Sequence, residues 1–330
     1  MRPALKSLFL WLVLLVCVTA TLAGQIPASF RVPVLGYVLD REIHAIRPVV
    51  GIPGNSRIGS PIDFGVPVSD VAFLGDQQYA VVVSPQEAEA LFVDLEDPAH
   101  VQHIAGVSSS ISSIRASADG TKAALYDSHS GQIFVVGGIP TALTVLRTID
   151  VSLEGTGLTR FAITNDGMSA LLAYRGEESD TLYTWEPTTG RRFVTGAARI
   201  ADIAFVGADA VVTDSGSDQV LLIRGVRDQA APALVADFRD GVNQPGAIAV
   251  SSRNEIYIGV AEAVLVMDAT GHLLRRVPCG CTITTMTPLR DAALQLTDQL
   301  DRPLWVLDTR TDAERILFVP ALSAEMRPAP

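Results

Sequence analysis

The sequence is poor in cysteine, in lysine and in aromatic residues. Its 330 residues include three cysteines, too few for a disulfide framework, and only 6% aromatic residues. Two lysines accompany 23 arginines, and 36 acidic residues outnumber all basic ones, so the formal net charge is −11. This balance argues against nucleic acid or an anionic membrane surface as a partner. Charged residues make up 18% and hydrophobic residues 48%, so the chain can bury a large core and disorder is not expected.

Long hydrophobic runs are also missing, except at the N-terminus. There Arg2 and Lys6 precede an apolar, uncharged stretch at 7–18, and small residues follow it up to Ala23. This order predicts a secretory signal peptide over 1–23. The alternative is an uncleaved anchor, but the run is shorter than the about 20 apolar residues that a membrane span needs. We therefore expect a secreted or periplasmic protein without a membrane span in the mature chain. Removal of Arg2 and Lys6 with the signal peptide leaves 23 basic and 36 acidic residues, so the mature chain has a formal charge of −13.

Six similar units follow one another along the rest of the chain. Each has an apolar run, a tight polar turn, a second apolar run, then a third strand-like stretch and a weaker fourth. The turns contain Gly, Asp or Asn, which let a short hairpin reverse. Four short strands per unit, without helical periodicity, predict an all-β fold, a single β-propeller. The first apolar positions recur at spacings of 38 to 47 residues, at Val71, Ile114, Phe161, Ile203, Ile248 and Met286.

A shorter unit precedes these six, at residues 32–52. Its GYVLD stretch at 36–40 matches the third-strand pattern, and the residues near 55–65 form an insertion or an extra strand. We predict seven blades, the first one incomplete; six blades plus an N-terminal hairpin is the alternative. The propeller is placed at 24–330, with blades at about 32–65, 68–107, 108–152, 158–197, 198–238, 242–280 and 281–322.

Several stretches resemble known propeller repeats. Residues 245–280, which begin PGAIAVSSRNEIYIGV, resemble an NHL or YVTN-type repeat, and AVVTDSGSDQVLLI at 210–223 resembles the "ADSGNNRV" stretch of that group. LYTWEPTTG at 182–190 is closer to the ending of a WD40 repeat, with Glu186 where Asp is usual. The Gly-His and Asp-x-His positions of WD40 blades are absent in register. The resemblance implies an exported bacterial NHL/YVTN-type, WD40-like propeller. It implies no function, because propellers host binding modules, lyases, lactonases and quinoproteins alike.

Charged residues recur where the chain enters an inner strand or leaves a second strand. In a propeller these positions converge on one face near the central channel, so they predict a site for a polar or cationic ligand at the channel mouth. The alternative is that these Asp side chains only bond to turn backbone. The candidate ligand-binding residues are Asp70, Asp127, Arg160, Asp202, Asp214 and Asp298, together with Arg115.

Arg115 differs from the residues at the equivalent position of the other predicted inner strands. The equivalent positions hold small residues: Ala72, Ala162, Ala204, Ala249 and Thr287. A charge beside the channel must be paired or reach water. Arg115 either contacts an anionic ligand or pairs with an acid of a neighbouring blade, and the sequence favours the pair.

Recognisable catalytic and metal motifs are absent. There is no Gly-rich phosphate loop, no G-x-S-x-G elbow and no H-E-x-x-H. The stretch from Asp214 to Asp218 spaces oxygens as a calcium loop does but lacks the bidentate Glu. His100 and His103 have no acid or cysteine to complete a zinc site. We therefore predict no catalytic residue and no cofactor, with calcium at this loop as the only candidate.

The favoured hypothesis is an exported binding module for a protein, peptide or glycan, with its site at the channel mouth. One alternative is a propeller enzyme of the lyase or lactonase kind, with a divalent metal among the ring aspartates. Another is a structural, envelope-associated scaffold. Fold and composition do not decide among these three.

Two cysteines, Cys279 and Cys281, remain after Cys17 leaves with the signal peptide. In an oxidising compartment this pair predicts a disulfide. Residues two apart on an extended strand have Cα atoms about 7 Å apart, at the limit for bridging, so the ring needs a turn at Gly280. The alternative is a pair of buried thiols that pack as small apolar residues.

Overall fold

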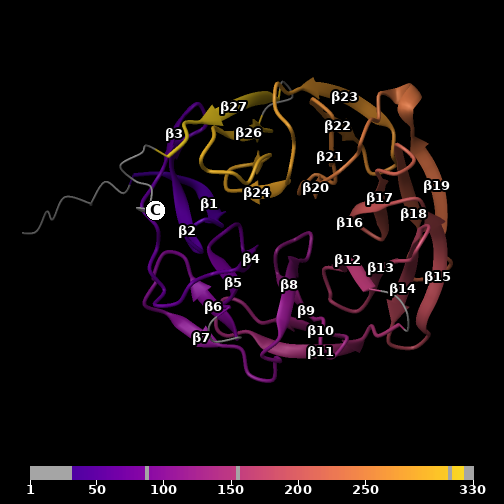
Figure 1. The fold of residues 1–330 in the computed structure, drawn as a ribbon, viewed down its shortest axis with the longest axis horizontal. Coiled ribbons are helices and arrows are strands. Elements are labelled where there is room, and N and C mark those ends of the chain that lie inside the picture. Colours follow the sequence, from indigo (N-terminus) through magenta and orange to yellow (C-terminus); the bar gives the residue numbers. More distant parts are fainter. Residues whose placement is uncertain (1–31, 86–88, 154–156, 311–313, 323–330) are drawn as a thin grey trace, which may run out of the picture. The chain divides into compact units, whose positions relative to one another are not determined.

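The computed structural model describes residues 32–85, 89–153, 157–310 and 314–322. From Val34 onward the chain forms one compact unit of seven antiparallel sheets set around a central axis (Figure 1). Six sheets have four strands each, and the first has three. The fold is a seven-bladed β-propeller, so the prediction of seven blades with an incomplete first one is confirmed. The predicted signal peptide at 1–23 lies outside the described residues.

Each four-stranded blade is one consecutive stretch of chain, ordered from the channel outward. The described part of the chain contains no helix long and apolar enough to cross a membrane; the short 3-10 turn η1 (Phe238–Asp240) follows blade 5. Blade 1 comprises β1 (Val34–Asp40), β2 (Ala45–Ile52) and β3 (Asn55–Ile58). Blade 2 comprises β4 (Asp70–Leu74), β5 (Tyr79–Val83), β6 (Ala90–Asp94) and β7 (Val101–His103), and blade 3 comprises β8 (Ile111–Ala116), β9 (Lys122–Asp127), β10 (Gln132–Gly137) and β11 (Thr144–Asp150). Blade 4 comprises β12 (Gly157–Ile163), β13 (Ala170–Arg175), β14 (Asp180–Glu186) and β15 (Gly190–Ala197), and blade 5 comprises β16 (Ile200–Val206), β17 (Asp209–Asp214), β18 (Gln219–Arg224) and β19 (Ala231–Ala236). Blade 6 comprises β20 (Ile248–Val250), β21 (Ile256–Val260), β22 (Ala263–Met267) and β23 (Leu273–Pro278), and blade 7 comprises β24 (Thr287–Leu289), β25 (Ala293–Gln295), β26 (Leu304–Asp308) and β27 (Arg315–Val319).

Burial explains why the middle strands read as continuous apolar runs. In blade 6 every residue of β21 (IYIGV) and β22 (AVLVM) is buried, because neighbouring blades cover both faces of the sheet. The outermost strand β23 instead alternates half-buried and exposed residues, since one of its faces is open to water. This difference in burial explains why each repeat has strongly apolar second and third strands and a weaker fourth strand.

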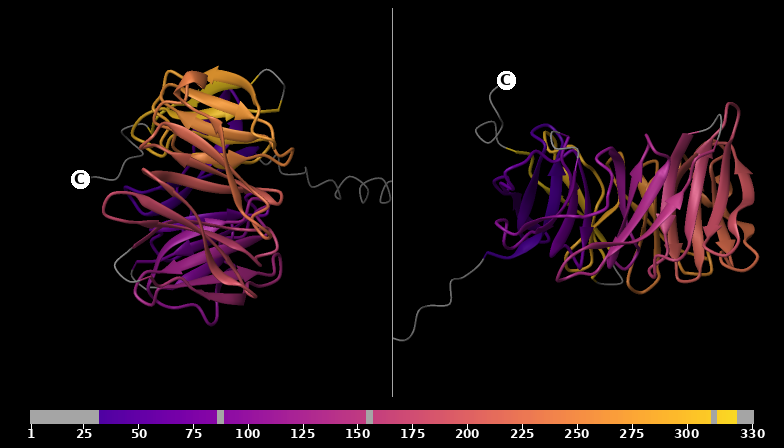
Figure 2. Two further views of the ribbon diagram at one scale, coloured as in Figure 1. Left: turned by 90° about the vertical axis from the view of Figure 1, so that its right-hand side faces the viewer. Right: turned by 90° about the horizontal axis from the view of Figure 1, so that it is seen from below.

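The two faces of the ring differ in the loops they carry. The first residue of an inner strand pairs with the last residue of the second strand, as in Ile111 with Asp127 and Ile200 with Asp214. Both ends therefore lie on one face, which we call the entry face. The turns between first and second strands lie on the opposite face, which we call the hairpin face, and the strands run between the two (Figure 2).

Blade 1 lacks its innermost strand. β1 begins at the hairpin face, where the carbonyl of Leu35 accepts a hydrogen bond from the Arg290 N–H, and ends at the entry face, where Arg41 donates to the Ser69 carbonyl. This is the direction of a second strand, and β3 lies beside the outermost strand β27 of blade 7. The GYVLD stretch is therefore a second strand, and the third-strand assignment was wrong. Second and third strands carry equally buried apolar runs, which periodicity alone does not separate.

The side chain of Gln77 occupies the free edge of β1. Its Oε1 accepts a hydrogen bond from the Tyr37 N–H at 2.6 Å, and its Nε2 donates to the Pro288 carbonyl at 2.7 Å. Its own carbonyl accepts from Arg290 at 2.8 Å. A side chain at Gly36 would place a Cβ 2.6 Å from Gln77 Oε1, so glycine permits this approach. These bonds connect blades 1, 2 and 7, where the two ends of the ring meet.

A disulfide joins Cys279 and Cys281 in the link between β23 and β24. The chain bends at Gly280, and the Cα atoms of the two cysteines lie 5.1 Å apart. Both residues are buried in the apolar cluster that blades 6 and 7 share. The bend shortens the distance that an extended strand would impose, which removes the geometric objection to bridging.

Thiol titration of the unfolded, unreduced protein should find no free thiol. The intact mass should be about 2 Da below that of the reduced chain, since each sulfur loses one hydrogen on bridging. A Cys279→Ser variant serves as the control and should show one reactive thiol. Two free thiols per chain in the wild type would contradict the bridge.

Candidate functional site

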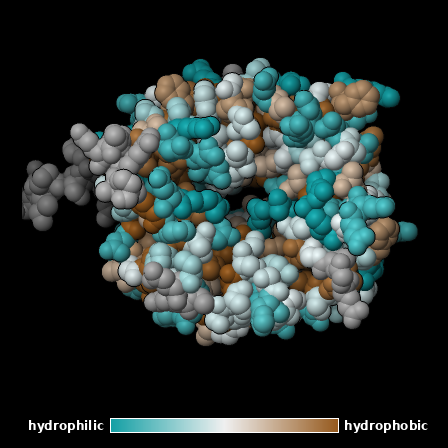
Figure 3. Space-filling view, in the orientation of Figure 1, coloured by the Kyte–Doolittle hydropathy of each residue, from teal (hydrophilic) through white to brown (hydrophobic). Residues whose placement is uncertain are grey.

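Three charged side chains from three blades meet in the central channel. Arg115 comes from β8, Arg160 from β12 and Asp202 from β16. The Nη2 atom of Arg115 lies 3.9 Å from Oδ1 of Asp202, and Nε of Arg160 donates to the Ala201 carbonyl at 2.6 Å. We call these three residues the channel cluster. Hydrophilic side chains lie on the left and right sides of the hollow at the centre of the ring (Figure 3).

The channel cluster has an excess of positive charge. The side chain of Arg115 is 45% exposed and makes no hydrogen bond among the described residues. Burial lowers the pKa of Arg160, and Arg115 lowers it further, while Asp202 opposes this shift. An arginine stays protonated in any such environment, so the three residues of the channel cluster carry a net charge of +1; Arg175 and Asp180 also act on Arg160, with opposite effects. The predicted acid partner of Arg115 exists, but it belongs to blade 5, two blades from blade 3.

Asp70 and Asp202 connect neighbouring inner strands. Oδ2 of Asp70 accepts a hydrogen bond from the Ile114 N–H at 3.1 Å, and Oδ2 of Asp202 accepts from the Ile248 N–H at 3.0 Å. The second oxygen of Asp70 accepts from the Val71 N–H. Each carboxylate thus joins its blade to the next one. Asp70 accepts two backbone hydrogen bonds in this way and Asp202 one, so both carboxylates have structural roles and keep part of their acceptor capacity.

Asp127 is buried beneath the entry face, with 1% of its surface exposed. Its oxygens accept hydrogen bonds from the hydroxyls of Ser108 and Ser130 and from the backbone N–H groups of His129 and Ser130. Burial raises the pKa of this carboxyl group, but the four hydrogen bonds outweigh burial and hold the pKa well below its usual value. Asp127 organises the turn between β9 and β10 and is not available to a ligand.

Asp214 has the same role in blade 5. It is 3% exposed and accepts hydrogen bonds from the N–H groups of Ala198, Arg199 and Gly216 and from the Ser217 hydroxyl. These bonds lower its pKa against the effect of burial. In the same predicted calcium loop, Oδ1 of Asp218 accepts from the Gln244 N–H. Across the described residues, no group of three or more His, Cys, Asp or Glu side chains is arranged to hold a metal ion.

Asp298 lies outside the channel cluster, in the loop after β25. Its Oδ1 accepts a hydrogen bond from the Thr284 hydroxyl at 2.7 Å, and its Oδ2 lies 3.9 Å from Nε of Arg41. The pair with Arg41 joins blade 7 to blade 1. Of the seven candidate residues, the structure thus gathers Arg115, Arg160 and Asp202 in the channel, with Asp70 bonded to the neighbour of Arg115.

Sequence reasoning missed one buried ion pair, Asp40 with Arg47. Nε of Arg47 donates to Oδ2 of Asp40 at 2.7 Å, and both side chains are at most 4% exposed. Asp40 ends β1, the position that Asp127 and Asp214 hold in their blades. An aspartate at the end of a second strand recurs in the repeats and could have pointed to Asp40. The assignment of GYVLD to a third strand placed Asp40 at a different position of the repeat.

Neither a protein-family model nor a curated protein matches the chain. Similar solved structures include a functionally unknown protein from Desulfotomaculum acetoxidans, 16% identical over 88% of this chain and 100% of that one, with a TM-score of 0.59. Kuenenia stuttgartiensis hydrazine synthase is 15% identical over 90% of this chain and 99% of that chain, at a TM-score of 0.57. Virginiamycin B lyase from Staphylococcus aureus is 8% identical over 79% and 86% of the two chains, at 0.55.

At these identities the likeness concerns the fold alone. The similar structures are a synthase, a lyase and a protein of unknown function, as expected of a fold that hosts many functions. The class that the structure defines is therefore the seven-bladed β-propeller. Any function must be argued from the side chains of this chain.

Proposed function

We propose that this protein is an exported binding module that holds a carboxylate of its ligand at the channel cluster. The observation that carries the proposal is the half-exposed guanidinium of Arg115, whose N–H donors have no hydrogen-bond acceptor among the described residues. Arg160 adds a second positive charge beside it. Guanidinium groups bind carboxylates through paired, charge-assisted hydrogen bonds.

The charge of the rest of the protein supports an anionic ligand at this place. The chain as a whole carries a formal charge of −11, so a positive cluster inside the channel is a local exception. An acidic ligand is repelled by the outer surface and attracted at the channel, which favours one binding position. The two guanidinium groups beside Asp202 disfavour the cationic ligand that the sequence suggested.

The substitution Arg115→Gln should weaken carboxylate binding about ten- to hundredfold, because a hydrogen bond to a charged group contributes about 1.5–3 kcal/mol. Isothermal titration with acetate, succinate and citrate measures the effect. The control is Arg57→Gln, an exposed arginine on β3 that lies away from the channel. Equal affinity in the Arg115 variant and the wild type, or no binding of any of the three anions, would contradict the proposal.

Export is part of the same proposal and rests on the N-terminal sequence. Signal peptidase should cleave after Ala23, so the mature protein begins at Gly24. Intact-mass measurement on protein recovered from the periplasm or the medium tests this. A mature chain that retains residues 8–18 would make the protein membrane-anchored instead.

A further inference from the structure

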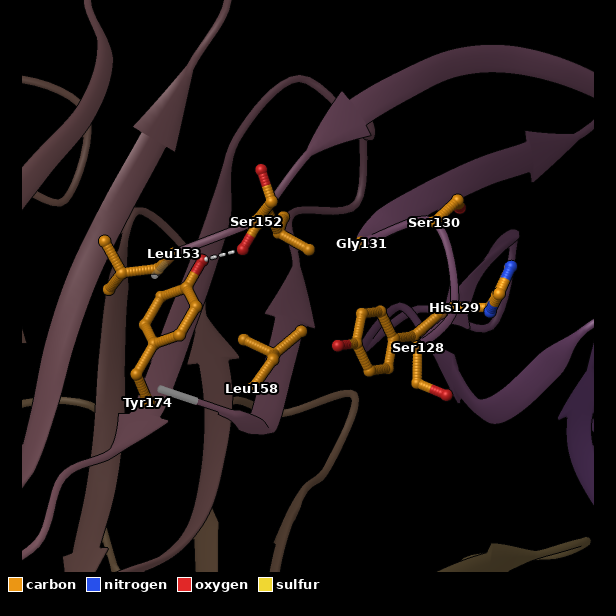
Figure 4. A pocket seen from close by; sticks show the side chains of 10 residues that line it. Ser128, His129, Ser130, Gly131, Ser152, Leu153, Leu158 and Tyr174 are labelled. Atoms are coloured by element: carbon orange, nitrogen blue, oxygen red, sulfur yellow. Dashed lines mark hydrogen bonds between the residues drawn. The ribbon is translucent and has the colours of Figure 1, made fainter. Parts of the chain in front are cut away.

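A cavity apart from the central channel opens on the entry face between blades 3 and 4 (Figure 4). Its volume is about 230 Å³, and none of the channel cluster residues lines it. The walls come from the turn after β9, the link after β11 and the facing ends of β12 and β13. The residues that matter for its chemistry are Tyr126, Ser128, Ser130, Ser152, Leu158 and Tyr174.

One wall of this cavity is held rigidly. The hydroxyl of Tyr174 donates a hydrogen bond to the Val151 carbonyl at 2.7 Å. The guanidinium of Arg191 lies 5.7 Å from the centre of the Tyr174 ring and donates to the Ser152 carbonyl at 2.9 Å. The ring therefore keeps one orientation beside Ser152 and Leu158, as Figure 4 shows. Tyr174 is only 1% exposed, so its ring supports this wall from behind and keeps the cavity preformed, which lowers the entropy cost of binding.

The opposite wall contains a hydroxyl without a partner. Tyr126 packs its ring against Phe161, with centroids 6.0 Å apart, so the position of the ring is set by the core. Its hydroxyl makes no hydrogen bond to any described residue. Burial raises the pKa of Tyr126, and the negative charge of Asp127 raises it further, so the hydroxyl stays protonated and remains a donor at neutral pH.

The serine hydroxyls supply acceptors. Ser130 donates to Asp127 and Ser152 donates to Asp150, each at 2.7 Å, so the lone pairs of both serine oxygens remain for a ligand. The hydroxyl of Ser128 has no partner among the described residues and adds both a donor and an acceptor. Asp127 lies behind these serines, and its oxygens are already occupied by four donors.

We propose that this cavity binds one sugar residue of a glycan. A neutral polyhydroxylated ring offers apolar C–H groups to the partly exposed side chains of Tyr126 and Leu158, and hydroxyls to the Tyr126 hydroxyl and the serines. An anion finds no arginine or lysine among the lining residues, and a purely apolar ligand leaves the hydroxyls unpaired. The volume is below the about 300 Å³ at which drug-sized ligands are usually accommodated, which matches a single ring.

Saturation-transfer NMR with methyl α-glucoside, methyl β-galactoside and N-acetylglucosamine on the mature protein tests the proposal. At least one of these sugars should show binding in the millimolar range. The variants Tyr126→Phe and Ser128→Ala should each weaken it about two- to tenfold, since each removes one hydrogen bond. The matched control is Tyr79→Phe, which removes the hydroxyl of a tyrosine that packs on Phe92 in another blade.

Retained sugar binding in Arg115→Gln would separate this cavity from the channel cluster and support a second site. Two results would overturn the proposal. One is the absence of saturation transfer to all three sugars at tens of millimolar. The other is binding that Tyr126→Phe and Ser128→Ala leave unchanged, which would place the sugar elsewhere on the protein.

Discussion

Replacing Gln77 by alanine should lower the free energy of unfolding by about 2–5 kcal/mol. The change removes the acceptor of the Tyr37 N–H, which is left unpaired in a buried place, and the donor to the Pro288 carbonyl, which is only partly buried. A buried polar group without a partner costs about 1–3 kcal/mol. The loss is concentrated where blades 1 and 7 meet, since blade 1 has no inner strand to supply these bonds.

Urea unfolding followed by tryptophan fluorescence measures this loss of stability. The control is Gln78→Ala, because the neighbouring Gln78 side chain is exposed and its removal should change stability by less than about 0.5 kcal/mol. A Gln77→Gly variant separates the two properties of this position. Gln77 has a φ of 59°, which glycine adopts without strain. A Gln77→Gly variant more stable than the wild type would therefore show that relief of backbone strain outweighs loss of the side-chain hydrogen bonds.

The substitution Asp214→Asn should cost about 2–4 kcal/mol of stability. The carboxylate accepts hydrogen bonds from three backbone N–H groups and one hydroxyl, two at each oxygen. Asparagine keeps one acceptor oxygen, but its NH₂ group cannot accept, so two of the four bonds are lost. The two N–H groups of Ala198 and Arg199 lie in the chain between blades 4 and 5, so the loss affects the packing of these blades. Asp228→Asn, at an exposed position, is the control and should leave stability unchanged.

The pH dependence of stability gives an independent measurement of the same carboxylate. The pKa of Asp214 is lower in the folded state than in the unfolded state, so its contribution is complete above the unfolded pKa of about 4. The contribution is lost as the pH falls through the lower, folded pKa. The stability difference between wild type and Asp214→Asn should therefore be constant above about pH 5 and shrink below it. A variant as stable as the wild type at pH 7 would contradict a stabilising role of these hydrogen bonds.

The repeat pattern determined the fold because each blade is built from nearby residues. The apolar positions from Val71 to Met286 recur at blade spacing, and the turns between them carry the residues that short hairpins require. Each sheet forms from one consecutive stretch of chain, so a local pattern contains the information needed to predict it. The seven blades, the incomplete first blade and the common face of the strand ends all followed from the sequence.

Only the tertiary structure decided what the charged side chains do. Asp70 bonds to Ile114 in the next blade, and Arg115 faces Asp202 two blades away. Gln77 meets Tyr37 and Pro288 where the two ends of the ring close. These partners are distant in sequence, and nothing local to a loop aspartate distinguishes a carboxylate filled by backbone N–H groups from one open to a ligand. A repeat pattern determines how each blade folds, whereas the contacts between blades depend on closure of the whole ring.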